Sequence, residues 1–131
     1  MALGVSTFLM FDGKAEQAMN FYVSLFGNSS VEAVERYGPG EPVPEGGVKT
    51  ARFNVGGHPM MCIDSPVTHA FTFTPSVSLF VECESAEEQD QAFARLADGG
   101  QILMPLDNYG FSTRFGWLND RFGVSWQLNL A

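Results

Sequence analysis

The stretch TFLMFDGKAEQAMNFYVSLF, from Thr7 to Phe26, contains the two patterns that decide the fold. Its beginning belongs to an apolar, partly β-branched segment, Val5–Phe11, which ends at Asp12-Gly13 and is typical of a β-strand. From Lys14 to Phe26, apolar residues recur at spacings of three and four, which predicts a helix with one apolar face. Asp12 is the expected N-cap of this helix. The chain is therefore expected to open with a strand followed by a helix.

Three extended segments follow this helix, and the same order of elements then recurs in the second half. The segment Ser85-Ala-Glu-Glu88 is a capping box, in which the serine hydroxyl and the glutamate carboxylate satisfy each other's free backbone donors. It predicts the start of a second helix. The other expected strands are Ser30–Tyr37, Val48–Val55, His58–Asp64, Ser76–Cys83, Gln101–Leu106, Thr113–Asn119 and Ser125–Leu130.

The order βαβββ thus occurs twice, in a first module of about residues 1–66 and a second module of about residues 74–131. A shift of 72 positions aligns Phe8 with Phe80 and Phe21 with Phe93, in matching elements. We therefore interpret the chain as a single α+β domain built from a duplicated module.

The composition excludes several classes of protein. With 45% hydrophobic and 17% charged residues, the chain is expected to fold around a core rather than to be disordered. Its net charge of −8 and the absence of a Lys/Arg cluster argue against a nucleic-acid partner. No apolar stretch approaches the roughly 20 residues that a membrane-spanning helix needs. A cytoplasmic protein without a membrane partner is the expectation.

Three runs of the sequence give a more specific indication. They are Thr7–Phe26, MCIDSPVTHAFTFTPSVSLFVECES (Met61–Ser85) and LMPLDNYGFSTRFGWLNDRFGVSWQL (Leu103–Leu128), which together cover about half of the chain. In these runs the sequence resembles PhnB-like members of the vicinal oxygen chelate superfamily, which also contains glyoxalase I, bleomycin-resistance proteins and extradiol dioxygenases. The resemblance implies tandem βαβββ modules that form a curved, eight-stranded mixed-sheet cup with an apolar interior, in a homodimer.

Metal-dependent members of this superfamily hold an ion in the cup with histidines or carboxylates. The resemblance places the corresponding positions at about Thr7, Met61, Ser78 and Gln127. None of these is a histidine, aspartate or glutamate, and hydroxyls beside a thioether make a poor site for Zn²⁺, Ni²⁺ or Fe²⁺. No cofactor is expected, although a divalent metal with differently placed ligands stays open.

The subgroup that the sequence resembles carries the name 3-demethylubiquinone-9 3-methyltransferase. A methyltransferase that uses S-adenosylmethionine normally has a glycine-rich turn directly after its first parallel strand and an acidic residue at the end of the next. Neither feature occurs here, because the only glycine-dense segment, Gly38–Gly47, precedes a strand. The residues therefore do not favour this activity.

Two further groups of residues are candidates for chemistry. Cys62, Asp64 and His69 could form a nucleophilic arrangement, but a strand cysteine more often serves as a small apolar side chain. Apolar, aromatic and amide side chains near the strands could line the cup and bind a ligand, although about half of the strand positions must pack under the helices instead. These ligand candidates are Phe8, Met10, Met61, Phe80, Tyr109, Phe111, Trp117, Trp126 and Gln127.

The sequence thus leads to one expected function and two alternatives. We expect a protein that binds a small apolar or aromatic molecule in the cup without a tightly held metal. A metal-dependent lyase, isomerase or dioxygenase is the first alternative, and the methyltransferase is the second. The ligand, and whether any reaction is catalysed, stay open.

Overall fold

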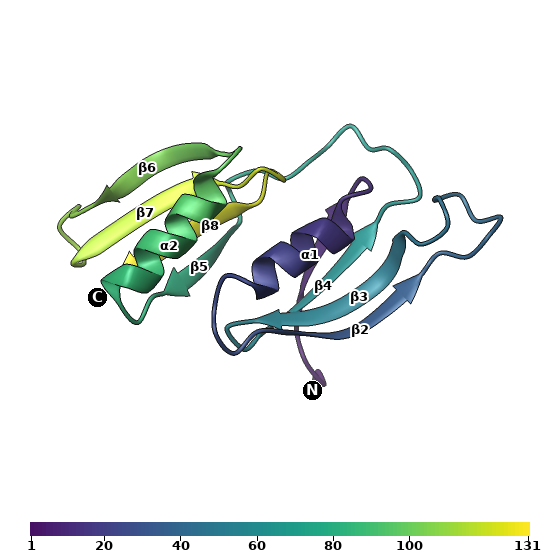
Figure 1. The fold of residues 1–131 in the computed structure, drawn as a ribbon, viewed down its shortest axis with the longest axis horizontal. Helices are drawn as coiled ribbons and strands as arrows, with labels where there is room; N and C mark the ends of the chain where they lie inside the picture. Colours follow the sequence, from purple (N-terminus) through teal and green to yellow (C-terminus); the bar gives the residue numbers. More distant parts are fainter. The chain divides into compact units, whose positions relative to one another are not determined.

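Eight strands and two helices follow one another in the order βαβββ, βαβββ in the computed structural model, which describes residues 1–131 (Figure 1). The chain divides into two compact units, residues 1–69 and residues 70–131, and each contains one copy of the repeat. The expected α+β class with tandem modules is confirmed. The eight strands form two mixed sheets of four. Neither helix is long and apolar enough to cross a membrane.

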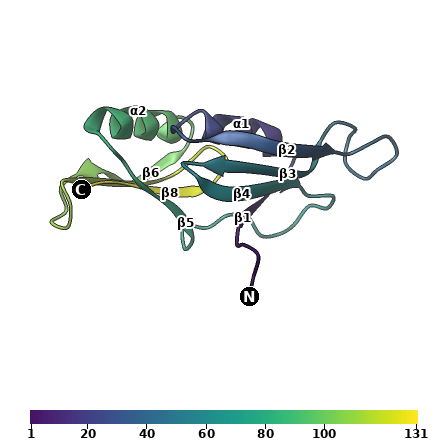
Figure 2. The same ribbon diagram turned by 90° about the horizontal axis from the view of Figure 1, so that it is seen from below.

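The first unit pairs its strands in the order β1-β4-β3-β2, with β1 parallel to β4 and the other pairs antiparallel. Its helix packs over one face of this sheet (Figure 2), where alternate strand residues such as Leu9, Phe53 and Met60 are buried. The elements are β1 (Thr7–Phe11), α1 (Ala15–Val23), β2 (Ser30–Arg36), β3 (Val48–Val55) and β4 (His58–Asp64).

The second unit repeats this topology in the order β5-β8-β7-β6. Its helix lies so close to β7 that a Cβ at Gly116 would stand 2.5 Å from the Phe93 ring, so only glycine fits there. The elements are β5 (Ser78–Glu82), α2 (Ala86–Ala97), β6 (Gln101–Asp107), β7 (Arg114–Asn119) and β8 (Ser125–Leu130). Strand boundaries in both units lie within two residues of the expected ones.

A buried carboxylate ties α1 to its sheet. Asp64, at the end of β4, accepts hydrogen bonds from the backbone N–H of Ala15 and of Val48, each 2.9 Å long. Ala15 is the first residue of α1, so Asp64 satisfies a donor that the helix leaves free at its N-terminus. The expectation that Asp12 caps this helix is therefore wrong, because the cap position is Lys14 and its side chain makes no capping bond.

The first helix also ends earlier than its apolar pattern suggests. Its last residue is Val23 rather than Phe26, and the next residue, Ser24, donates from its hydroxyl to the Phe21 carbonyl over 2.6 Å. The Ser24 backbone N–H bonds the same carbonyl. A serine hydroxyl that bonds a carbonyl three residues earlier competes with the backbone hydrogen bonds that would continue the helix, which explains its early end.

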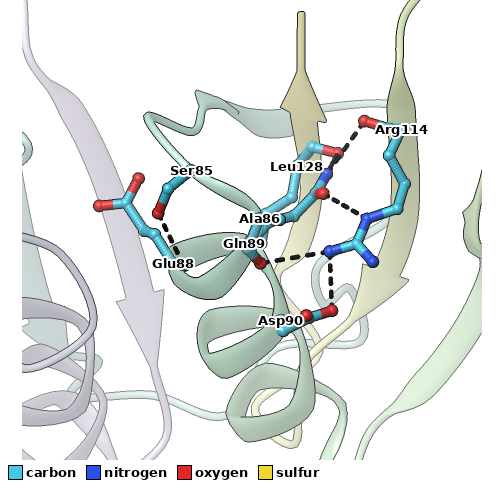
Figure 3. Close-up of polar contacts among 7 residues, drawn as sticks. All are labelled: Ser85, Ala86, Glu88, Gln89, Asp90, Arg114 and Leu128. Atoms are coloured by element: carbon cyan, nitrogen blue, oxygen red, sulfur yellow. Dashed lines mark hydrogen bonds and ion pairs between the residues drawn. The ribbon is translucent and has the colours of Figure 1, made fainter.

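The second helix has the expected Ser85 cap, although the Glu88 carboxylate accepts from the Glu84 N–H rather than from the Ser85 N–H. Ser85 Oγ accepts from the Glu88 N–H at 3.1 Å. A buried amide also ties this helix to the sheet (Figure 3). Gln89 is fully buried, donates from Nε2 to the carbonyls of Arg114 and Leu128, and accepts from Arg114 Nε at 2.8 Å. Arg114 also pairs with Asp90 at 2.7 Å. Gln89 therefore bonds two strands and helps to hold the helix on this face of the sheet.

We expect Asp64→Asn to lower the free energy of unfolding of the first unit by about 2–3 kcal/mol, since an amide offers only one acceptor oxygen to two buried N–H donors. Urea unfolding followed by circular dichroism measures this change. Asp12→Asn is the matched control, because Asp12 is exposed and caps nothing, and it should stay within about 0.5 kcal/mol of the wild type. Equal effects of the two substitutions would contradict the anchoring role of Asp64.

Candidate functional site

Each sheet has one helix, so each has a second face that its own helix does not cover. In the second unit, Gly116 packs against Phe93 of α2, and its strand neighbours Phe115 and Trp117 therefore point the opposite way. We call this opposite side of the second sheet the open face. Its residues on β5, β7 and β8 are Ser78, Phe80, Glu82, Phe115, Trp117, Asn119, Ser125, Gln127 and Asn129.

Four aromatic rings gather on the open face. Phe115 lies at their centre, with ring centroids 6.3 Å from Phe80, 6.2 Å from Tyr109 and 5.1 Å from Phe111. Phe115 is itself buried, whereas Phe80 is 53% and Phe111 64% exposed. The Tyr109 hydroxyl donates to the Pro105 carbonyl over 2.6 Å, which fixes its ring beside β6. The result is an exposed aromatic surface around one buried ring.

A line of hydrogen bonds runs beside these rings. The Trp117 indole N–H donates to Ser125 Oγ over 2.8 Å, Ser125 Oγ lies 2.7 Å from Ser78 Oγ, and Gln127 Nε2 donates to Ser78 Oγ over 3.1 Å. Ser125 is buried and the other three side chains are half-buried. Gln127 pairs across the strands with Phe80, so the polar line and the rings are adjacent.

The other side of the aromatic cluster is also polar. Asn129, which is 9% exposed, donates from Nδ2 to Glu82 Oε2 over 3.0 Å. Because a carboxylate only accepts, the amide nitrogen of Asn129 must face Glu82 and its amide oxygen must point away. This amide oxygen is buried and has no hydrogen-bond partner. The amide oxygen of Asn119 and the hydroxyl of Ser112 are likewise buried and unpartnered. Unsatisfied buried oxygens of this kind are uncommon in folded proteins.

The open side of the first sheet is more apolar. Phe8 and Met10 of β1 are exposed there and pair with Met61 and Ile63 of β4. Thr7 belongs to the alternate side of β1, and its hydroxyl lies 2.9 Å from His58 Nε2. Thus Phe8, Met10 and Met61 share one face of the first sheet.

Trp126 does not lie with the other ligand candidates. It alternates with Gln127 on β8, points to the helix side and is only 1% exposed. Its indole N–H donates to Asp120 Oδ2 over 2.9 Å, and Asp120 Oδ1 accepts from the backbone of Phe122 and Val124. The expectation that Trp126 lines a ligand-binding cup is wrong, because strand alternation places it in the core.

The four positions matched to superfamily metal ligands do not fit a divalent metal. Ser78 and Gln127 do come together, but as a hydroxyl that accepts from an amide N–H. Thr7 and Met61 lie on opposite faces of the first sheet, since Phe8 rather than Thr7 pairs with Met61. Neutral donors that already bond each other offer no carboxylate, imidazole or thiolate to a metal. Nor does any cluster of three or more His, Cys, Asp or Glu side chains suit a metal elsewhere in the chain.

The proposed Cys62, Asp64 and His69 arrangement does not assemble as a nucleophilic site. Cys62 is fully buried under α1, and burial, together with the Asp64 charge, raises the pKa of its thiol to about 12. The Asp64 carboxylate is committed to Ala15 and Val48, and His69 Nε2 lies 3.1 Å from Ser65 Oγ in an exposed segment. A neutral, buried thiol without an adjacent base is a packing residue.

Five residues of the open face were not among the sequence candidates: Glu82, Phe115, Asn119, Ser125 and Asn129. Each of them lies two positions along its strand from a candidate, and residues two apart share a face of the sheet. Strand alternation could therefore have identified Phe115 from Trp117 and Ser125 from Gln127. The hydrogen bond between Ser78 and Ser125 joins residues 47 positions apart and had no local signal.

A family model and two solved structures match nearly the whole length of this chain. A family model described as 3-demethylubiquinone-9 3-methyltransferase matches residues 4–129. A PhnB protein structure from Bacillus cereus is 57% identical, with a TM-score of 0.94 and coverage of 97% of this chain and 98% of that one. Protein PA1353 from Pseudomonas aeruginosa is 30% identical, with a TM-score of 0.85 and 98% coverage of both chains.

Two more distant proteins extend the comparison. The protein YjdN of Escherichia coli (strain K12) is 23% identical over 140 residues, covering 97% of this chain and 95% of YjdN. The fosfomycin resistance protein FosX from Listeria monocytogenes is 13% identical with a TM-score of 0.62, covering 100% of this chain and 95% of FosX, and shares the fold alone.

We expect Cys62 to resist alkylation in the folded protein. A rise of its pKa from 9.0 to about 12 lowers the thiolate fraction near pH 8 by about 1,000-fold. Iodoacetamide labelling read by peptide mass spectrometry measures this. The control is the same protein in 6 M guanidinium, about the concentration that unfolds most domains, where Cys62 should react as a free thiol. Rapid labelling of Cys62 in the folded state would show that the thiol is accessible and ionised.

Proposed function

The chain belongs to the PhnB-like 3-demethylubiquinone-9 3-methyltransferase family of the vicinal oxygen chelate superfamily, and from this premise we propose that it binds a small aromatic molecule on the open face, without a tightly held metal. The observation that carries the proposal is the exposed aromatic cluster around Phe115. The family shares a fold, but the activity must be argued from the residues of this chain.

The exposure of these rings supports a ligand site. Phe80 and Phe111 leave more than half of their surfaces in contact with water, at the cost of the free energy that burial of an aromatic ring releases. Contiguous exposed apolar surface of this kind usually marks a site of binding. An aromatic ligand would cover Phe80 and Phe111 and stack against them, with Phe115 as a rigid base.

The two polar margins of the cluster support a small molecule rather than an apolar surface alone. Ser78 and Gln127 lie on one side and Glu82 and Asn129 on the other. Small-molecule sites typically combine apolar walls with a few such polar groups, which orient the ligand. The buried, unpartnered oxygens of Asn119 and Asn129 add groups whose hydrogen-bonding capacity is unused.

The methyltransferase activity in the family's description finds less support in the residues. Between β1 and α1 the turn contains one glycine, Gly13, and the first free N–H of α1 is taken by Asp64. Both sheets are mixed, each with a single parallel pair, rather than the parallel sheet whose strand ends bind S-adenosylmethionine in doubly wound enzymes. S-adenosylmethionine in large excess should therefore leave the melting temperature unchanged.

We also propose that the protein forms a homodimer. Native mass spectrometry of the purified protein would read the dimer mass together with any small molecule that it retains. A retained aromatic compound would identify the ligand directly.

We expect an indole or naphthalene probe to bind with a Kd that Phe111→Ala weakens about 5-fold or more, because the substitution removes one aromatic wall. Titration followed by ¹⁵N NMR measures the affinity and locates the site through the amide signals of β5 and β8. The matched control is Phe71→Ala, which removes an equally exposed ring (66% against 64%) in the segment before β5, not one of the four rings of the cluster, and should keep the wild-type Kd. Failure of aromatic probes to shift the β5 and β8 signals would overturn the proposal.

We further expect no stoichiometric binding of Zn²⁺, Ni²⁺, Mn²⁺ or Fe²⁺, since Ser78 and Gln127 offer only neutral groups. Elemental analysis of the purified protein and calorimetric titration of each ion test this. One tightly bound ion per chain would instead favour a metal-dependent lyase, isomerase or dioxygenase.

A further inference from the structure

The polar line on the open face has a direction that can be derived from its members. An indole N–H only donates, so Ser125 Oγ must accept from Trp117. Ser78 Oγ accepts from the amide N–H of Gln127. What is left to decide is which serine donates in the 2.7 Å contact between Ser78 and Ser125.

Burial decides between the two arrangements. If Ser78 donated to Ser125, the proton of Ser125 would have no acceptor, although this side chain is only 1% exposed. If Ser125 donates, its proton has Ser78 Oγ as acceptor, and the unused proton belongs to Ser78, which is half-buried. A buried donor without an acceptor is strongly disfavoured, so the bond runs from Ser125 to Ser78.

Ser78 then accepts two hydrogen bonds, from Ser125 and from Gln127, and both of its lone pairs are occupied. Its own proton is free, so it can donate to a further group but cannot accept. The bonds from Trp117 through Ser125 polarise the Ser78 hydroxyl in the same direction, which strengthens it as a donor.

We propose that Ser78 is the specificity-determining donor of the open face and that the ligand is a neutral aromatic compound with a carbonyl oxygen that accepts from it, such as a ring ketone or an aromatic amide. This inference rests on the proposed function. Phe80 pairs across the strands with Gln127 and lies two residues from Ser78, so a ring on Phe80 can carry an acceptor to the Ser78 hydroxyl.

The hydrogen bonds and charges around Ser78 argue against an ionic group as its partner. An ammonium group only donates, and Ser78 has no lone pair for it. A carboxylate would accept, but it would meet Glu82 on the same strand face in a chain of net charge −8. The nearest arginine on these strands, Arg114, is bound to Gln89 and Asp90 on the helix side. A neutral acceptor is therefore the group that this position selects.

Four probes with one carbon skeleton test the proposal: indane, 1-indanone, 1-aminoindane and indane-1-carboxylate. We expect 1-indanone to bind the wild type about 3- to 10-fold more tightly than indane, the range of one hydrogen bond, and more tightly than either ion. ¹⁵N NMR titration gives each Kd, and the side-chain signals of Trp117 and Gln127 report contact with this end of the face. Equal affinities of indane and 1-indanone, or tightest binding of the amine, would overturn the assignment of Ser78 as the donor.

Two substitutions separate donation from folding. Ser78→Ala should abolish the preference for 1-indanone over indane while indane binding is kept, whereas Ser76→Ala, the same change in an exposed serine outside the polar line, should preserve the preference. Ser125→Ala removes the bond into Ser78 and frees a lone pair there, so the relative affinity for 1-aminoindane should rise. An unchanged preference in Ser78→Ala would contradict the inference.

Failure of the inference and failure of the proposed function give different results. If none of the four probes shifts the β5 and β8 signals, the open face does not bind aromatic molecules and the proposed function is wrong. If the probes bind but 1-indanone binds no more tightly than indane, the proposed function stands and the role assigned to Ser78 is wrong.

Discussion

Each four-stranded sheet of this protein has two faces and a single helix, and this imbalance governs the rest of the structure. One face of each sheet can be buried by its own helix, so residues of alternate parity on the same strands are not covered by that helix. Buried polar groups tie the helix to its face: the Asp64 carboxylate bonds the start of α1, and the Gln89 amide bonds two strands from within α2. The location of the open face follows from these attachments.

The two units share a topology but differ at corresponding positions. On the parallel strand pair of the first unit, Phe8 faces Met61, whereas on that of the second unit Phe80 faces Gln127. The first open side is therefore apolar and the second combines rings with hydrogen-bonding groups. The second unit has an aromatic cluster beside hydrogen-bonding groups on the face that its helix does not cover. These differences lie at positions that the helices do not cover.

The fold could be predicted more completely than the site. Strand and helix identities follow from hydrophobic periodicity, which is local in sequence. The Ser85 cap of α2 was predicted because its partner, the Glu88 N–H, lies three residues away. The cap of α1 was mispredicted, since the carboxylate that performs this role, Asp64, lies 49 residues from Ala15. Trp126 and Trp117 are both strand tryptophans, and only packing against α2 distinguishes the buried one from the one on the open face.

The sequence by itself determined the order of elements, the duplication, the family and the neutral character of the side chains at Ser78 and Gln127. These properties depend on residue type and local spacing, which can be read directly from the sequence. Only the tertiary structure decided which alternate residues are covered, which rings meet around Phe115, and that Trp117, Ser125 and Ser78 form one directed line of hydrogen bonds. The physical reason is that these contacts join separate strands, whose register and covered face arise only when the sheet and its helix pack together.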